Sequence, residues 1–144
     1  MTTAPNEDFF EFVQRCREAV GQQVSGRTET FQSLWSRADD VVLFGAAGSH
    51  QKGWDAVSAR LTWASEHLNF GKFDAENLLT GVSEPIAFTV DLEHMSRETN
   101  GKLERRTLRA SQGYRLEDDH WRVVFRHGDP MAERIVPAEA VGYP

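Results

Sequence analysis

The hydrophobic residues of this chain change their spacing once, close to Phe70, and this change constrains the fold more than any other feature. Before Phe70 they recur every three or four residues, which is the period of an amphipathic helix. After it they alternate with polar residues, which is typical of strands with one buried face. Helices followed by antiparallel strands predict an α+β domain. A chain of 144 residues, 40% of them hydrophobic, is long enough for one such domain with a buried core.

Three helices are expected before the change. The first follows Asn6, a possible cap, and its apolar stripe consists of Phe9, Phe12, Val13, Cys16, Ala19 and Val20. The second begins near Thr28 and ends before residues 39–40, and a short strand over residues 41–44 follows it. The third begins at Gly53.

The sequence after Phe70 predicts an antiparallel meander. Three strong strands are expected over residues 86–98, 103–116 and 121–127, with a weaker strand before them over residues 73–79. Asn100-Gly101 and residues 117–120 favour tight hairpins between the strong strands. We expect a single domain over residues 1–144, with its core over about 6–130 and an irregular tail over 131–144.

Alternation also predicts which side chains of the strong strands face the core. The inward sets, strand by strand, are Ile86, Phe88, Val90, Leu92 and His94; Leu108, Ala110, Gln112, Tyr114 and Leu116; and Trp121, Val123, Phe125 and His127. Bringing the first two sets onto one face requires a three-residue loop at Gly101. That loop would place Glu93 opposite Arg109 on the outer face.

Charge and composition exclude several classes of function. The net charge of −6 argues against binding of nucleic acid, which needs a clustered basic surface. The apolar runs are too short to span a membrane, and the first residues lack the pattern of a signal peptide. The single cysteine, Cys16, fits a reducing compartment. A cytoplasmic globular protein is therefore expected.

The order of elements and a few short motifs resemble the SnoaL-like and ketosteroid isomerase-like families of the nuclear transport factor 2-like superfamily. The motifs are Leu34-Trp35, Gly53-Trp54, IAFTV over 86–90, Leu108-Arg109 and WRVVFRHGDP over 121–130. The resemblance implies a cone-shaped, curved antiparallel sheet packed on three N-terminal helices, with an apolar pocket between them. Members of this fold include isomerases, polyketide cyclases, dehydratases and proteins that only bind or assemble, so the fold does not choose the function.

Comparison with ketosteroid isomerase implies that its chemistry is absent. That enzyme uses an aspartate base and an oxyanion hole made of a tyrosine and a protonated aspartate. Phe44 stands at the position of the base, Cys16 at that of the tyrosine and Gln112 at that of the protonated aspartate. A phenyl ring cannot accept a proton and a thiol is a weak donor, so steroid isomerisation by these residues is not expected.

His127 is the leading catalytic candidate, because histidine titrates near neutral pH and this one ends the inward set of the last strand. The alternative is a structural histidine bonded to Asp129. Many SnoaL-like relatives carry a second histidine where this chain has Phe125. Tyr114 and Gln112 could orient a carbonyl or hydroxyl group, or have a structural role, since each needs a hydrogen-bond partner if it is buried. The expected pocket residues are Cys16, Phe44, Trp54, Leu61, Phe88, Val90, Leu92, Trp121, Val123 and Phe125.

No metal motif, phosphate-binding loop or nucleophile elbow occurs, so no cofactor or metal is expected. One hypothesis is a cofactor-free isomerase, cyclase or dehydratase that acts on a small, apolar carbonyl compound. The alternative is a non-catalytic domain for ligand binding or oligomerisation. We also expect a homodimer through the outer face of the meander, with Glu93, Arg109, Ser111 and Arg122 at the interface.

Overall fold

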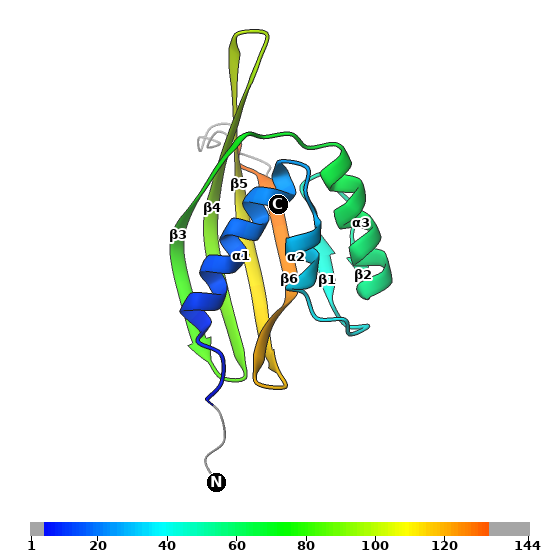
Figure 1. Ribbon diagram of the computed structural model, residues 1–144, viewed down its shortest axis with the longest axis vertical. Coiled ribbons are helices and arrows are strands. Elements are labelled where there is room, and N and C mark those ends of the chain that lie inside the picture. Colours follow the sequence, from blue (N-terminus) through cyan, green and yellow to red (C-terminus); the bar gives the residue numbers. More distant parts are fainter. Residues whose placement is uncertain (1–4, 133–144) are drawn as a thin grey trace, which may run out of the picture.

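The helices of this protein lie along one face of a curved sheet, as the computed structural model in Figure 1 shows. The structure describes residues 5–132. In chain order the elements are α1 Phe9–Val24, α2 Glu29–Ser33, β1 Val42–Phe44, β2 Gln51–Lys52, α3 Trp54–Glu66, β3 Lys72–Ser83, β4 Ile86–Thr99, β5 Lys102–Glu117 and β6 His120–Pro130. The predicted α+β architecture is confirmed. Most of the tail predicted to be irregular lies outside the described residues.

The strands follow the order β2-β1-β6-β5-β4-β3 across the sheet. Neighbouring strands are antiparallel, except that the short β1 runs parallel to β6. The β4–β5 hairpin extends beyond the helices at one end of the molecule (Figure 1). Within residues 5–132, no helix is long and apolar enough to cross a membrane.

The spacing of apolar residues in α1 produces the buried face that the sequence predicts. All six residues of its predicted stripe are buried. Asp8, rather than Asn6, caps the helix, because its carboxylate accepts a hydrogen bond from the backbone N–H of Glu11 at 3.0 Å. At the sheet, Trp121 is fully buried and its indole N–H donates to the backbone oxygen of Glu7 at 2.9 Å. The segment that leads into α1 is therefore fixed at Glu7 to the end of the β5–β6 hairpin.

The hairpin between β4 and β5 corrects the predicted register. Asn100 and Gly101 form a two-residue turn with φ of 53° and 77°, and Thr99 pairs directly with Lys102. Asn-Gly suits this turn, because both positions require the left-handed conformation. Leu92 therefore lies opposite Arg109, and Glu93 lies opposite Leu108. The predicted three-residue loop and the Glu93–Arg109 pair are wrong.

This register also reverses the predicted faces of β4. The residues that face the helices are Ala87, Thr89, Asp91, Glu93 and Met95, all buried. The predicted inward set points away from the helices, with Ile86 60% and Phe88 44% exposed. Alternation was a poor guide here because paired and hydrogen-bonded polar residues occupy the interior, while apolar ones remain on the outside.

A β-bulge explains the second reversal, in β6. Gly113 pairs with Phe125 but Tyr114 pairs with Val123, so Val124 is an extra residue on β6. An extra residue changes the face of every side chain beyond it. Trp121 and Val123 are buried as predicted, but beyond the bulge Arg126 is buried and His127 is exposed. The predicted inward placement of Phe125 and His127 is wrong.

Candidate functional site

A cavity of about 300 Å³ lies between the inner face of the sheet and the helices. All three helices and four strands contribute to its wall, and its apolar residues include Val20, Val24, Phe31, Leu43, Leu61 and Leu108. These side chains are buried, so the deep part of the cavity is a hydrophobic surface. Such a concave, mostly apolar cavity is the usual form of a binding site for a small molecule.

One charged side chain, Arg126 of β6, lies in the deep part of this wall. Its Nη1 and Nη2 atoms donate to the two carboxylate oxygens of Glu93 on β4, at 2.9 Å and 2.6 Å. Burial acts to lower the pKa of Arg126, but the attraction of Glu93 outweighs it and the pKa is raised. The site therefore holds a permanent guanidinium whose charge is balanced by one carboxylate.

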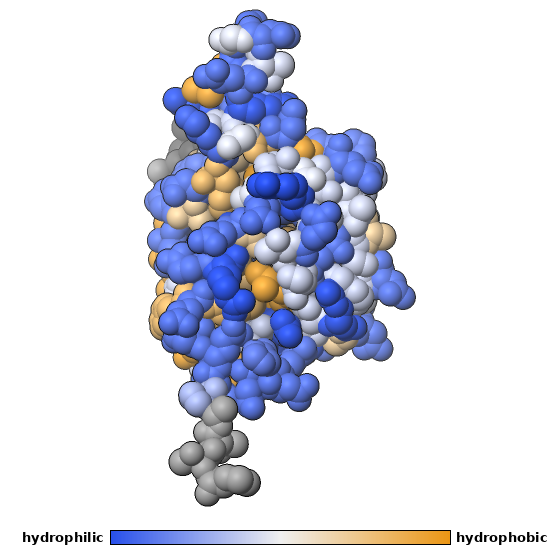
Figure 2. Space-filling view, in the orientation of Figure 1, coloured by the Kyte–Doolittle hydropathy of each residue, from blue (hydrophilic) through white to orange (hydrophobic). Residues whose placement is uncertain are grey.

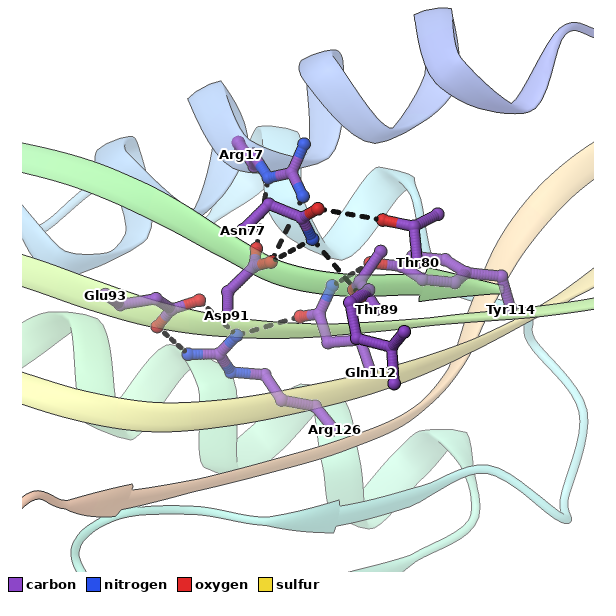
Figure 3. Close-up of polar contacts among 10 residues, drawn as sticks. Arg17, Asn77, Thr80, Thr89, Asp91, Glu93, Gln112, Tyr114 and Arg126 are labelled. Carbon is purple, nitrogen blue, oxygen red and sulfur yellow. Dashed lines mark hydrogen bonds and ion pairs between the residues drawn. The ribbon is translucent and has the colours of Figure 1, made fainter. Parts of the chain in front are cut away.

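Gln112 and Tyr114 of β5 extend this pair into a buried hydrogen-bonded chain (Figure 3). Arg126 donates to Oε1 of Gln112 at 2.8 Å, which turns the amide nitrogen of Gln112 towards Oη of Tyr114, also at 2.8 Å. Oη of Tyr114, which accepts from the Gln112 amide, is also 2.7 Å from the hydroxyl of Thr89, and either hydroxyl can be the donor of that bond. Burial raises the pKa of Tyr114, so this phenol stays protonated.

A second polar cluster lies beside this chain and joins α1 to the sheet (Figure 3). Arg17 of α1 donates to both carboxylate oxygens of Asp91, at 3.0 Å and 3.1 Å. Asn77 of β3 also donates to Asp91, at 2.8 Å. These residues do not line the cavity described above. They fix the helix that forms one of its walls.

The exposed and half-buried part of the cavity wall includes Arg60, Trp63, His67 and Arg106, and we call these four residues the rim. Arg60 lies 3.9 Å from the ring centre of Trp63, and the imidazole of His67 stacks on the same indole at 4.4 Å. Nδ1 of His67 is 2.7 Å from the backbone oxygen of Trp63. Since a carbonyl only accepts, Nδ1 carries the proton of this bond and Nε2 is left for another contact.

The predicted site residues are divided between the interior and the outer face. Gln112 and Tyr114 face inward as predicted, but they bond to each other and to Arg126 rather than line the cavity. Among the ten predicted pocket residues, Leu61 lines the cavity. Three others are buried in the hydrophobic core away from it: Cys16, Trp121 and Val123. Trp54 is partly buried, with the guanidinium of Arg37 above its ring at 3.9 Å.

The remaining predicted residues lie on the outer face, and their predicted place in the pocket is wrong. Phe44 is 39% exposed, and its ring contacts those of His127 and Phe125. Leu43, its neighbour, points into the cavity instead. Phe88, Val90 and Leu92 share the outer face of β4. His127 thus lies on the opposite face of β6 from Arg126 and the interior polar groups, so it cannot act there as an acid or base.

Sequence reasoning missed Arg126 and Glu93, the charged pair at the cavity. Arg126 and His127 are adjacent and therefore point to opposite faces of β6. The extra residue at the bulge puts Arg126 on the inner face and His127 on the outer face. The available signal was Gly113, because a glycine inside a strand often marks a bulge. A second signal was the acidic pair Asp91 and Glu93 at alternate positions of a strand, which requires partners if that face is buried.

The model of the SnoaL-like domain family matches residues 14–133. The chain belongs to the SnoaL-like family. The match covers both the cavity and the rim, so the site lies within the SnoaL-like domain. No similar sequence was found among curated proteins.

Solved structures of the nuclear transport factor 2-like superfamily share this fold. A candidate calcium/calmodulin-dependent protein kinase type II association domain from Thiobacillus denitrificans superposes with a TM-score of 0.73 at 18% identity, covering 90% of this chain and 100% of that one. A candidate dehydratase of this superfamily from Streptomyces avermitilis superposes with a TM-score of 0.68 at 18% identity. The match covers 86% of this chain and 97% of that one. A superfamily member from Salmonella enterica superposes with a TM-score of 0.65 at 18% identity, and the match covers 88% of this chain and 91% of that one. At this identity the likeness shows the fold alone.

The chemistry available to this SnoaL-like domain follows from its lining residues. Within residues 5–132, the cavity wall contains no carboxylate, and its ionisable groups are Arg60, His67, Arg106 and Arg126. Three N–H groups of Arg126 are used by Glu93 and Gln112, out of the five that a guanidinium offers. The deep wall can therefore still donate hydrogen bonds to a guest molecule.

Proposed function

We propose that this SnoaL-like domain binds a small, largely apolar molecule and donates a hydrogen bond from Arg126 to its carbonyl or hydroxyl oxygen. The observation that carries this proposal is a buried guanidinium, with two N–H groups to spare, in the wall of an apolar cavity. Because Glu93 already balances the charge of Arg126, we expect the ligand group that accepts a hydrogen bond from Arg126 to be neutral.

The volume of the cavity limits the size of the ligand. About 300 Å³ accommodates about ten water-sized groups, at roughly 30 Å³ each. A ketone or alcohol with a chain of about eight carbons fits this space. A four-ring steroid exceeds it, which agrees with the absence of the isomerase residues from the sequence.

Binding is better supported than catalysis by this geometry. Isomerases, cyclases and dehydratases move protons and need a titratable group beside the substrate. Arg126 keeps its proton, and Tyr114 is removed from the cavity by its bonds to Gln112 and Thr89. Among the described lining residues there is one histidine, His67, and it lies at the rim rather than in the deep wall.

The proposal is tested by filling the cavity from α3. Ala64 lines the cavity, whereas Ala56 on the same helix is exposed and lies outside it. Calorimetric titration with 2-octanone is expected to detect binding to the unmodified protein and to Ala56→Phe. Ala64→Phe should bind about tenfold more weakly, or about 1.4 kcal/mol. Equal affinity in the two variants would contradict the proposal.

A second role, self-association through the outer face, is supported by a separate observation. The outer face of β3 and β4 carries Leu79, Ile86 and Phe88, which are 54%, 60% and 44% exposed. An apolar surface of this kind marks an interaction site. The occupant we propose is a second copy of the chain, paired by two-fold symmetry so that the same surface covers itself. Among structural relatives, one is described as an association domain and another as a hub.

The proposed interface differs in part from that expected from the sequence. Arg109, Ser111 and Arg122 belong to the outer face, but Glu93 lies inside and pairs with Arg126. Arg109 pairs with Asp129 instead, at 2.8 Å. Apolar residues of β4 take the central place that Glu93 was expected to have.

A further inference from the structure

We infer that the ligand also carries a carboxylate, which Arg60 and Arg106 hold at the rim while its apolar chain fills the cavity. This inference rests on the proposed function and names the class of ligand, a medium-chain carboxylic acid that also has the carbonyl or hydroxyl group met by Arg126. The deep wall and the rim thereby take different parts of one molecule: a chain inside and an anion at the opening.

Arg60 is the first group at the rim that an anion would meet. Its guanidinium lies against the indole of Trp63, and both residues line the cavity. Stacking on an aromatic face holds an arginine in place while leaving its in-plane N–H groups available. In the described part of the chain, no carboxylate pairs with Arg60. Its charge is thus fixed beside the opening without a partner of opposite sign.

Arg106, on β5, adds a second cation that is only weakly paired. Its nearest carboxylate oxygen belongs to Glu104 and is 3.7 Å away. Glu104 is bound more closely by Arg97, at 2.8 Å, and this bond lowers the pKa of Glu104. Because Glu104 is already engaged, Arg106 retains donors that can form a charge-assisted bond with a ligand carboxylate.

The charge distribution around the cavity favours an anion over a cation. The lining residues include three arginines and a histidine but no carboxylate within the described part of the chain. Glu93 neutralises Arg126 in the deep wall, so the excess positive charge lies at the rim. The chain as a whole has a net charge of −6, so this basic rim is a local feature. Local charge of this kind attracts and orients an oppositely charged ligand.

The experiment compares three eight-carbon molecules that differ in their head group: octanoate, 1-octanol and octylamine. Each is titrated into the full chain at pH 7 and low salt, and binding is measured by calorimetry. We expect octanoate to bind about tenfold more tightly than 1-octanol, equivalent to about 1.4 kcal/mol, and octylamine to bind more weakly than both. The double variant Arg60→Gln/Arg106→Gln should lose this preference and bind octanoate no more tightly than 1-octanol.

A matched control removes the same kind of charge nearby. Arg105 is exposed, is adjacent to Arg106 and does not line this cavity, so Arg105→Gln should keep the preference for octanoate. Equal affinity for octanoate and 1-octanol, tighter binding of octylamine, or an unchanged preference in the double variant would overturn the carboxylate assignment. These outcomes would leave the proposed binding function standing. If none of the three molecules binds, both proposals fail.

Discussion

Arg126 is the residue on which the chemistry of the cavity depends. It lies in the deep wall, it is neutralised by Glu93, and Gln112 fixes the orientation of its guanidinium. Tyr114 and Thr89 in turn fix Gln112. Tyr114 and Gln112, two of the three residues first considered as catalytic, therefore act as positioning residues.

Replacing one member of the buried pair should be much more harmful than replacing both. Arg126→Met leaves the Glu93 carboxylate buried without a partner and is expected to lower the free energy of unfolding by about 3–5 kcal/mol. The double variant Glu93→Met/Arg126→Met removes both charges and should recover most of this loss. The free energy of unfolding of the single and the double variant is measured by urea denaturation, with circular dichroism as the signal. A double variant as unstable as the single one would show that the ion pair itself supplies the stability.

Cys16 should be chemically inert in the folded protein. It is 1% exposed, and burial raises the pKa of its thiol from 9.0 to about 12. At pH 8 a thiol reagent is expected to react only after unfolding in guanidinium chloride, because the thiolate is the reactive form. Rapid reaction of the native protein would contradict this placement of α1.

The same shift in the Cys16 pKa predicts a loss of stability at high pH. The folded thiol keeps its proton to about pH 12, whereas the unfolded thiol loses it near pH 9. Between these values the folded state binds more protons, so the contribution of this group falls as pH rises through that range. Cys16→Ala should show a smaller decrease in unfolding free energy between pH 8 and pH 10 than the unmodified protein.

At the scale of elements, the first and third helices were predictable, the second ends at Ser33, earlier than expected, and the faces of the strands were only partly predictable. The stripe of α1 was correct because its six predicted residues are apolar and all of them are buried. On β4 the interior contains Asp91 and Glu93, whose partners Arg17 and Arg126 come from distant elements. Hydrophobic alternation carries no information about such partners. On β6 it failed at the bulge, where one residue changes the face of those that follow.

The two-residue hairpin that sets the β4–β5 register depends on the conformation of Gly101. Its φ of 77° is unfavourable for residues with a side chain. Gly101→Ala is expected to lower the free energy of unfolding by about 1–2 kcal/mol. Gly45→Ala is the control: its φ is not positive and a Cβ atom there meets nothing within 4 Å, so unfolding should be almost unchanged. Equal losses in the two variants would contradict the turn described here.

At the scale of the whole molecule, the two faces of the sheet differ in character. The side covered by helices is mostly hydrophilic, as Figure 2 shows in the orientation of Figure 1. The opposite face exposes Leu79, Ile86 and Phe88. The interior cavity and the proposed interface thus lie on opposite sides of the same strands. Residues of β4 therefore alternate between the two surfaces.

Self-association can be tested with one substitution on each side of the molecule. Phe88 on the outer face of β4 and Phe10 on α1 are both exposed, at 44% and 60%. Phe88→Glu places a charge in the proposed interface and is expected to convert a dimer into a monomer in light scattering at micromolar concentration. Phe10→Glu should keep the mass of the dimer. A monomeric mass for the unmodified protein would refute the interface.

The most direct test of the binding function locates the ligand by NMR. Methyl resonances of the leucine and valine residues would be followed during titration with 2-octanone. We expect shifts at Val24, Leu61 and Leu108, which line the cavity, and none at Val90 and Leu92 on the outer face. Shifts confined to the outer face, or no shifts with ketones of six to ten carbons, would contradict a ligand-binding cavity in this domain.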